Sequence, residues 1–261
     1  MGWARGALPG FFSPLEVAAS VPTTMARAAE LAAAGEPEGA TVLAEEQTEG
    51  RGRLGRVWVA PPGSSLLVSV VLRPPMATDA VWLTVAAAGV ALAGAVDEVA
   101  PGAAPAGLKW PNDLELGGRK AAGLLAEAQL EGGRLGAVLL GMGVNVGQGP
   151  DDFPPEVAGR ATSVSLAAGV PVDRGDLLAA WARRFLDGYA ELCAGRPGPV
   201  LAAYRQRLAT IGRQVRADRV GADPVTGTAV DLTPAGALVV RTASGARVEV
   251  LAGDVHHLRG V

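Results

Sequence analysis

Residues 107–146 read GLKWPNDLELGGRKAAGLLAEAQLEGGRLGAVLLGMGVNV. Two glycine pairs, Gly117-Gly118 and Gly132-Gly133, interrupt this stretch and predict tight turns. The turns separate three predicted strands, at 107–116, 119–129 and 135–146. Because strands joined by tight turns pair antiparallel, the stretch predicts a three-stranded antiparallel meander.

Helices and further strands are predicted on both sides of this meander. Asp79 is the expected N-cap of a long helix over residues 79–100. Residues 47–64 are rich in Gly, Arg and Pro, which predicts a long loop. The other predicted elements are helices at 23–34, 173–194 and 201–208, strands at 40–46 and 65–72, and a loop with one short helix at 147–172.

The pattern changes after Ile211, where short alternating segments are separated by Asp-Pro, Thr-Pro-Ala-Gly and Ser-Gly turns. About fifty residues of this kind predict a small β-barrel. We therefore expect an α+β chain with a domain boundary near Thr210, giving domains at 1–209 and 210–261. The predicted strands of the second domain are at 214–217, 226–232, 237–242 and 247–251.

Composition excludes several classes of function. The chain has 261 residues, 49% of them hydrophobic, and a net charge of −3, so it offers no overall basic field for nucleic acid. Its single cysteine, Cys193, excludes an internal disulfide and a cysteine-rich zinc site. The two histidines, His256 and His257, are adjacent, and neighbours on a strand point to opposite faces, so we expect them to be structural.

The longest uncharged apolar run, residues 80–96, is at the short limit for a membrane span. It is rich in Ala and Gly, which favours a buried core helix. The apolar start of the chain is broken by Pro9, Gly10 and Pro14, so no signal peptide is predicted. We expect a cytoplasmic protein with no membrane partner.

Lysine is confined to one short stretch. Of 23 basic residues only Lys109 and Lys120 are lysines, and the other 21 are arginines. An ammonium is a compact point charge, whereas guanidinium is a broad planar fork. Two ammonium groups this close indicate a site for phosphate or an acyl phosphate, although so few lysines can also cluster by chance.

A second basic cluster, residues 47–58, reads QTEGRGRLGRVW. Its glycines let the backbone approach a ligand, and its arginines offer bidentate contacts to phosphate or carboxylate. The alternatives are an ordinary basic surface loop and an RNA-binding Gly-Arg segment, but the latter usually needs repeats and the motif occurs once here.

Three further clusters complete the pattern. In Lys109–Asp113, Pro111 cannot donate a ladder hydrogen bond and marks a strand edge or bulge. Small residues over 118–127 suit the wall of a narrow apolar pocket. Residues 141–146, GMGVNV, suit a base or ribose packed on bare backbone, but no helix follows, as a dinucleotide motif would require.

Taken in order, these clusters resemble the biotin–protein ligases, over residues 15–261. The resemblance implies a catalytic domain related to class II aminoacyl-tRNA synthetases and a C-terminal SH3-like barrel. It also implies an activity: biotin and ATP, with Mg²⁺, form biotinyl-5′-AMP, and biotin is then transferred to a lysine of the biotin carboxyl carrier domain of a biotin-dependent carboxylase.

The resemblance also implies roles for individual residues. Lys109 and Arg51 would be catalytic, and no metal ligand is assigned. Biotin would be bound by Thr23, Thr24, Gln47, Gly50, Arg51, Gly52, Arg53, Lys109, Gly123 and Leu124. The adenylate would be bound by Arg53, Arg56, Trp58, Asn112, Lys120 and Asn145. One position departs from the family: Thr23-Thr24-Met25 stands where Ser-Thr-Asn is usual, and Met25 lacks the amide.

Two alternatives stay open. A lipoate–protein ligase would use a related fold and similar chemistry, and a biotin-sensing regulator would bind without catalysis. About twenty residues precede Thr23, with no helix-turn-helix pattern, so we expect the monofunctional class with no nucleic-acid partner. The sequence is compatible with a monomer or a homodimer.

Overall fold

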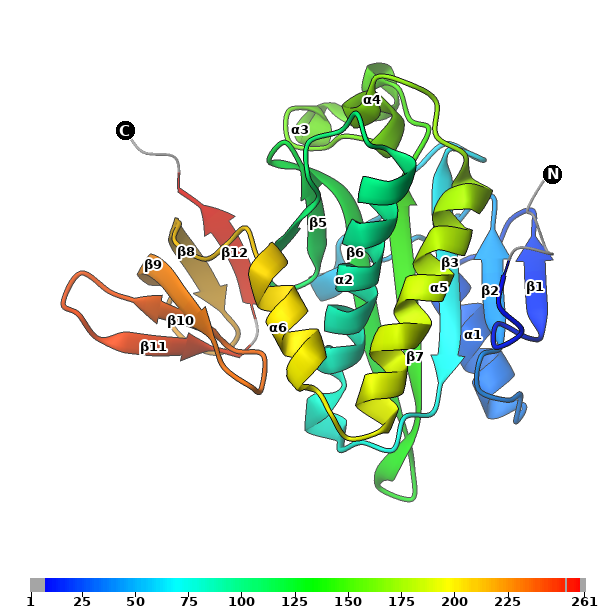
Figure 1. The fold of residues 1–261 in the computed structure, drawn as a ribbon, viewed down its shortest axis with the longest axis horizontal. Coiled ribbons are helices and arrows are strands. Elements are labelled where there is room, and N and C mark those ends of the chain that lie inside the picture. The colour runs from blue at the N-terminus through cyan, green and yellow to red at the C-terminus, as the bar shows by residue number, and fades with distance from the viewer. Residues whose placement is uncertain (1–7, 252, 259–261) are drawn as a thin grey trace.

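The computed structural model describes residues 8–251 and 253–258, and this part of the chain forms two β-sheets (Figure 1). The larger sheet has the strand order β1-β2-β3-β7-β6-β5-β4. β1 and β2 pair parallel and all other neighbours pair antiparallel. The strands are β1 (Leu15–Ala18), β2 (Thr41–Ala44), β3 (Ser65–Leu72), β4 (Gly107–Lys109), β5 (Asp113–Leu116), β6 (Arg119–Glu131) and β7 (Arg134–Asn145).

Helices cover both faces of this sheet. The main core lies on the face covered by α2 (Trp82–Val99) and α5 (Arg174–Cys193), with α6 (Gly198–Arg207) beside α2 (Figure 1). On the opposite face α1 (Thr24–Ala33) packs a smaller core over β2 and over one end of β3 and β7. The rest of that face is therefore left for the loops described below. Two short helices, α3 (Pro155–Ala158) and α4 (Val164–Ala168), lie in the connection from β7 to α5.

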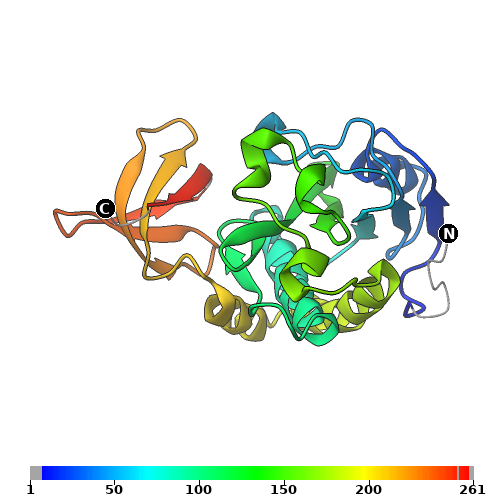
Figure 2. The same cartoon turned by 90° about the horizontal axis from the view of Figure 1, so that it is seen from above.

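The second sheet is five-stranded and antiparallel, in the order β11-β10-β9-β8-β12. Figure 2 shows it standing to one side of the larger unit, next to α6. Trp110 Nε1 of the larger unit donates to the carbonyl of Gly236 at 2.9 Å, which ties the two together. The strands are β8 (Gln214–Arg219), β9 (Val225–Leu232), β10 (Leu238–Arg241), β11 (Arg247–Val250) and β12 (Gly253–His257).

Most of the predicted elements are confirmed. The α+β class, the small C-terminal β-structure and the antiparallel arrangement of β5, β6 and β7 all appear, and both glycine pairs turn with positive φ. The run at 80–96 lies in a helix of the core, as expected. One described segment, Thr78–Val99, is long and apolar enough to cross a membrane, and most of its apolar window is buried in the fold. The domain boundary near Thr210 stays a prediction.

Several local predictions were wrong. The single strand expected over 107–116 is two strands, because the chain reverses at Pro111, which has no N–H for a ladder, and β4 pairs back onto β5. Asp79 is not an N-cap, because it lies in a 3₁₀ turn, Thr78–Ala80, and α2 starts after the buried Val81. Two short helices rather than one lie in 147–172. β1 and β12 were not predicted.

Candidate functional site

The predicted site residues gather on the half of the larger sheet that α1 leaves uncovered. Side chains alternate between the two faces of a strand, and the apolar set of β3, β6 and β7 lies in the core under α2 and α5. The opposite face therefore carries the small and polar residues. The register aligns them across three strands: Ser69 with Gly141, Leu67 with Gly143, Ser65 with Asn145, and Gly123 with Gly143.

Three of these residues, Gly123, Gly141 and Gly143, form a bare backbone surface that we call the glycine patch. A Cβ at Gly143 would lie 2.9 Å from Cε2 of Trp58, and one at Gly123 would lie 3.4 Å from Cζ3 of the same ring. A Cβ at Gly141 would lie 2.6 Å from Sδ of Met25. The indole of Trp58 and the thioether of Met25 therefore lie directly on backbone that only glycine exposes.

The Gly50–Trp58 loop folds back on itself to place that indole. Gly52 N–H donates to Arg56 O at 2.7 Å, and Trp58 N–H donates to Gly50 O at 2.9 Å. A Cβ at Gly50 would lie 2.4 Å from Trp58 O, so the returning strand needs glycine there. Among the described residues, Trp58 Nε1 is buried without a hydrogen-bond partner, which leaves one donor available to a ligand.

Both lysines lie at the edge of the glycine patch, and each ammonium has a carboxylate partner. Lys120 Nζ lies 2.6 Å from Asp113 Oδ1 and 5.8 Å from the centre of the Trp58 ring. Lys109 Nζ lies 3.7 Å from Glu115 Oε1, and both side chains are largely buried. The hairpin of β4 and β5 brings them together, because Lys109 pairs with Asp113 and Asp113 with Gly123.

Asn112 joins this hairpin to the loop. Its Nδ2 donates to Leu124 O at 2.6 Å, and its Oδ1 accepts from Arg53 Nη1 at 3.5 Å. The side chain of Leu124 itself is 2% exposed and belongs to the core on the helix side. Of the two neighbours expected to bind biotin, only Gly123 therefore belongs to the glycine patch, and Leu124 contributes its backbone carbonyl to Asn112.

The start of α1 meets the patch through a polar network. Thr24 N–H and Oγ1 donate to Gln47 Oε1 at 2.7 and 3.0 Å, and Ser69 Oγ donates to Thr24 Oγ1 at 2.8 Å. Thr23 is the N-cap, and its hydroxyl accepts from the Ala26 N–H at 2.9 Å. The Thr23 hydroxyl oxygen is thus used as a helix cap, whereas Thr24 and Gln47 are held beside the patch by their mutual hydrogen bonds.

Asn145 is held at the other end by residues that sequence reasoning missed. Its Nδ2 donates to Thr162 O at 3.1 Å, and its Oδ1 accepts from Gln148 Nε2 at 3.1 Å. Gln148 Nε2 also donates to Ser65 Oγ at 2.6 Å. Gln148 Oε1 is buried without a hydrogen-bond partner among the described residues.

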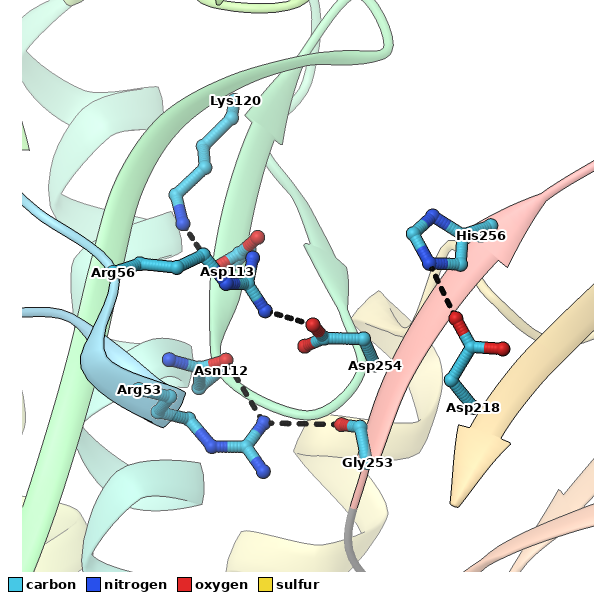
Figure 3. A network of polar contacts seen from close by, with 9 residues as sticks. All are labelled: Arg53, Arg56, Asn112, Asp113, Lys120, Asp218, Gly253, Asp254 and His256. Carbon is cyan, nitrogen blue, oxygen red and sulfur yellow. Dashed lines mark hydrogen bonds and ion pairs between the residues drawn. The ribbon is translucent and has the colours of Figure 1, made fainter. Parts of the chain in front are cut away.

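The C-terminal strand β12 also reaches the site, and no sequence signal indicated this. Arg53 Nη1 donates to Gly253 O at 3.4 Å, and Arg56 forms an ion pair with Asp254 (Figure 3). Burial lowers the pKa of Arg53, an effect that Asp254 and Asp113 oppose and Arg56 reinforces. The guanidinium thus lies in a partly dehydrated place between two carboxylates.

His257, on the same strand, lies near the hairpin of β4 and β5. Its Nε2 lies 3.3 Å from Thr210 Oγ1, and that hydroxyl accepts from the backbone N–H of Trp110 at 3.0 Å. Burial lowers the pKa of His257 to about 4, with further lowering from Lys109 and Arg213. The imidazole is therefore neutral near pH 7.

The carboxylates of the site are already matched by cations, and no group of three metal-ligating side chains occurs in the described part of the chain. This arrangement suits Mg²⁺ that arrives on a nucleotide, because Mg²⁺ usually binds through substrate phosphates, waters and at most one or two carboxylates. Arg51 stands apart from the other predicted residues. Its side chain is 72% exposed and lies 3.4 Å from Glu49.

Comparisons with known proteins agree with this geometry. Residues 17–145 match the model of the Biotin/lipoate A/B protein ligase family, and residues 210–258 match the Biotin protein ligase C terminal domain. The chain is 38% identical over 252 residues to the biotin--[acetyl-CoA-carboxylase] ligase of Mycobacterium tuberculosis, covering 94% of this chain and 89% of that one. It is 33% identical over 233 residues to the bifunctional ligase/repressor BirA of Bacillus subtilis, covering 89% and 70%.

Solved structures give the same result. The biotin protein ligase from Aquifex aeolicus in complex with biotin and ATP superposes with a TM-score of 0.80 at 27% identity, covering 95% of this chain and 100% of that one. The biotin protein ligase from Leishmania major in complex with biotinyl-5-AMP gives a TM-score of 0.61 at 26% identity, covering 92% and 99%.

Proposed function

Because the chain belongs to the biotin/lipoate A/B protein ligase family, we propose that it is a biotin–protein ligase that uses ATP. It activates biotin as biotinyl-5′-AMP and transfers the biotinyl group to a lysine of a carboxylase carrier domain. The observation that carries this function is the convergence of Lys109, Lys120 and the Gly50–Trp58 loop on the glycine patch. Compact cations and an arginine loop there surround glycine backbone on which a flat ring, that of Trp58, packs directly.

In the first step the biotin carboxylate attacks the α-phosphorus of ATP. An acyl–phosphate bond forms, the bond between the α-phosphorus and its bridging oxygen breaks, and pyrophosphate leaves. Two anions must approach each other, so the site has to neutralise their repulsion and the charge on the phosphate oxygens. We assign this to Lys109 from the hairpin and Arg51 from the loop. Mg²⁺, when bound, would supply further charge neutralisation.

Biotin binding is assigned to the side of the patch next to α1. Thr24 and Gln47 are held together there by hydrogen bonds, which supports their assignment to the polar head of biotin, with Thr23 beside them. Gly123 forms the floor and the backbone of Leu124 fixes its edge. The remaining contacts are assigned to the loop residues Gly50, Arg51, Gly52 and Arg53.

Adenylate binding is assigned to the side of the patch next to β12. Trp58 offers a flat ring and a free indole N–H, which supports contact with the nucleotide. Arg53, Arg56 and Lys120 supply positive charge for the phosphates. Asn112 and Asn145 are each held in place by hydrogen bonds, which supports their assignment to this side.

In the second step the amine of the acceptor lysine attacks the biotinyl carbonyl carbon. An amide bond forms, AMP leaves, and the amine loses its proton. Asp113 is held by Lys120 at 2.6 Å, so we assign it to fixing that ammonium rather than to taking this proton. The mixed anhydride hydrolyses readily in water, and closure of the Gly50–Trp58 loop protects it until the acceptor arrives.

The acceptor is the biotin carboxyl carrier domain of a biotin-dependent carboxylase. We further propose that the enzyme acts in the cytoplasm, as a monomer or a homodimer, without nucleic-acid or membrane partners. The net charge of −3 and the single cysteine support this setting.

The function is tested by exchange of labelled pyrophosphate into ATP, with biotin or lipoate as the acid. We expect exchange that depends on biotin and is near background with lipoate. Exchange supported by lipoate and not by biotin would assign the chain to the lipoate branch. Biotin binding without any exchange would indicate a sensor rather than an enzyme.

A further inference from the structure

Two consecutive residues of β12 hold two arginines of the Gly50–Trp58 loop. The carbonyl of Gly253 accepts from Arg53 Nη1 at 3.4 Å, and the carboxylate of Asp254 pairs with Arg56 (Figure 3). The loop and the strand are about two hundred residues apart in sequence. The same Arg53 guanidinium contacts Asn112 of the catalytic hairpin at 3.5 Å. The loop is therefore held between the hairpin and the C-terminal sheet.

The backbone of β12 is shaped for this contact at Gly253. A Cβ there would lie 1.9 Å from Asp218 O on β8, and its φ is +148°. Only glycine lets β12 lie this close to β8 while its carbonyl turns toward Arg53. The strand that carries the Gly253 carbonyl is therefore packed tightly against β8.

Asp254 occupies a position that is unfavourable for the sheet itself. It pairs across the sheet with Asp218 of β8, and like charges directly opposite each other are destabilising. Asp218 is balanced by its own partners, Arg216 at 3.0 Å and His256 at 3.1 Å. The partner of Asp254 is Arg56, which belongs to the loop. The carboxylate of Asp254 thus has its favourable interaction with the loop, through Arg56, and not within the sheet.

We propose that Asp254 is a positioning residue that docks the Gly50–Trp58 loop onto the C-terminal sheet and so holds the loop closed over the glycine patch. The catalytic part of this inference rests on the proposed function: docking keeps Arg53 and Arg56 facing the nucleotide and retains the adenylate. The docking itself is a property of the fold and does not depend on which acid is activated. The C-terminal sheet is then part of the site.

The test compares Asp254→Asn with Asp218→Asn in the full-length protein. Both variants remove one carboxylate from the same cross-strand pair, so both relieve the same repulsion, but only Asp254→Asn removes the partner of Arg56. Limited trypsin digestion without substrates, mapped by mass spectrometry, reports cleavage after Arg51, Arg53 and Arg56. We expect cleavage in the loop to be about 2- to 5-fold faster in Asp254→Asn, the size expected for loss of one partly exposed ion pair, and unchanged in Asp218→Asn.

A second measurement uses the substrates. With biotin, ATP and Mg²⁺ but no acceptor, we expect Asp254→Asn to raise the KM for ATP and the rate of biotinyl-5′-AMP escape by about 2- to 5-fold, with little change in kcat. The thermal unfolding midpoint should change little, because the cross-strand repulsion and one partly exposed ion pair are removed together. A residue that only supported the fold would instead lower the midpoint and leave the ratio of KM to kcat unchanged.

The outcomes separate the two proposals. Equal loop cleavage in wild type and Asp254→Asn overturns the docking, whatever the enzyme activates. Faster cleavage together with no biotin-dependent exchange in the wild type supports the docking and overturns the proposed function. Faster cleavage in an active enzyme with unchanged KM for ATP and unchanged adenylate escape overturns the catalytic role of Asp254.

Discussion

Replacing Lys109 by arginine separates the position of a charge from its presence. Lys109 is one of two lysines among 23 basic residues, and its side chain is 24% exposed. Its Nζ lies 3.7 Å from Glu115 Oε1, and Glu115 is itself nearly buried. Arginine keeps a cation beside Glu115, so the fold should tolerate it. Its guanidinium is wider than an ammonium and moves the charge away from the point where carboxylate and α-phosphate meet.

The magnitude follows from that displacement. A misplacement of about 1 Å at a reacting centre costs on the order of 10²-fold in rate, so Lys109→Arg should slow biotin-dependent pyrophosphate exchange by about 10²-fold. Lys109→Ala should slow exchange at least as much. Lys109→Ala also leaves Glu115 without its cation. Such a loss lowers the free energy of unfolding by about 3 kcal/mol when the ion pair is fully buried, and by less for this partly exposed pair. Only the alanine variant should therefore lower the unfolding midpoint clearly.

The control is Arg219→Lys on β8, where Nε donates to Asp223 O at 2.6 Å away from the site. This variant should exchange pyrophosphate near the wild-type rate. If Lys109→Arg keeps more than about half of the wild-type rate, the reasoning from lysine scarcity is refuted. Lys109 would then be a structural partner of Glu115 rather than a catalytic charge.

Three further predictions follow from the site. Gly143→Ala places a Cβ 2.9 Å from the Trp58 ring, so the indole must move; steady-state kinetics should show the KM for ATP raised about 10-fold, and an unchanged KM would contradict the stacking. The two lysines of the chain, Lys109 and Lys120, are both ion-paired in the site, so long incubation with biotin and ATP should leave little biotin on the enzyme, and several biotins per chain by mass spectrometry would refute this. In the folded protein the pKa of His257 is about 4, below its ordinary value of 6.5, so between these pH values the unfolded chain binds more protons and the free energy of unfolding falls as the pH drops. His257→Gln should therefore flatten the dependence of the free energy of unfolding on pH between 6.5 and 4, measured by denaturant unfolding at a series of pH values. The same slope in the variant and the wild type would contradict this assignment of the pKa.

The parts of the fold that depend on local sequence could be predicted. The glycine pairs at 117–118 and 132–133 fix two tight turns by their positive φ, and the strands between them follow from alternation. The Gly50–Trp58 loop and the two lysines were predicted as site residues from the alternation of Gly with Arg and from the scarcity of lysine in the chain. Pro111 was taken as an irregularity within one strand, whereas it is the turn between two, since a missing N–H is compatible with either.

The parts of the fold and of the site that depend on long-range pairing could not be predicted from the sequence. Gly123 and Leu124 are neighbours, and only the register of β6 against β7 decides which of them faces the patch. Asp254 and His257 lie far along the chain from Arg56 and Lys109, and no local pattern relates them. Their contacts arise from the way the C-terminal sheet docks beside the hairpin.

The most direct test of the proposed activity is transfer of labelled biotin to the carrier domain of a biotin-dependent carboxylase, with ATP and Mg²⁺. We expect one biotin per carrier domain, on its acceptor lysine, with none when that lysine is replaced by arginine and none when lipoate is supplied instead. Lack of transfer to any carrier domain under conditions that support pyrophosphate exchange, or equal transfer of lipoate, would contradict the assignment of this site to biotin ligation.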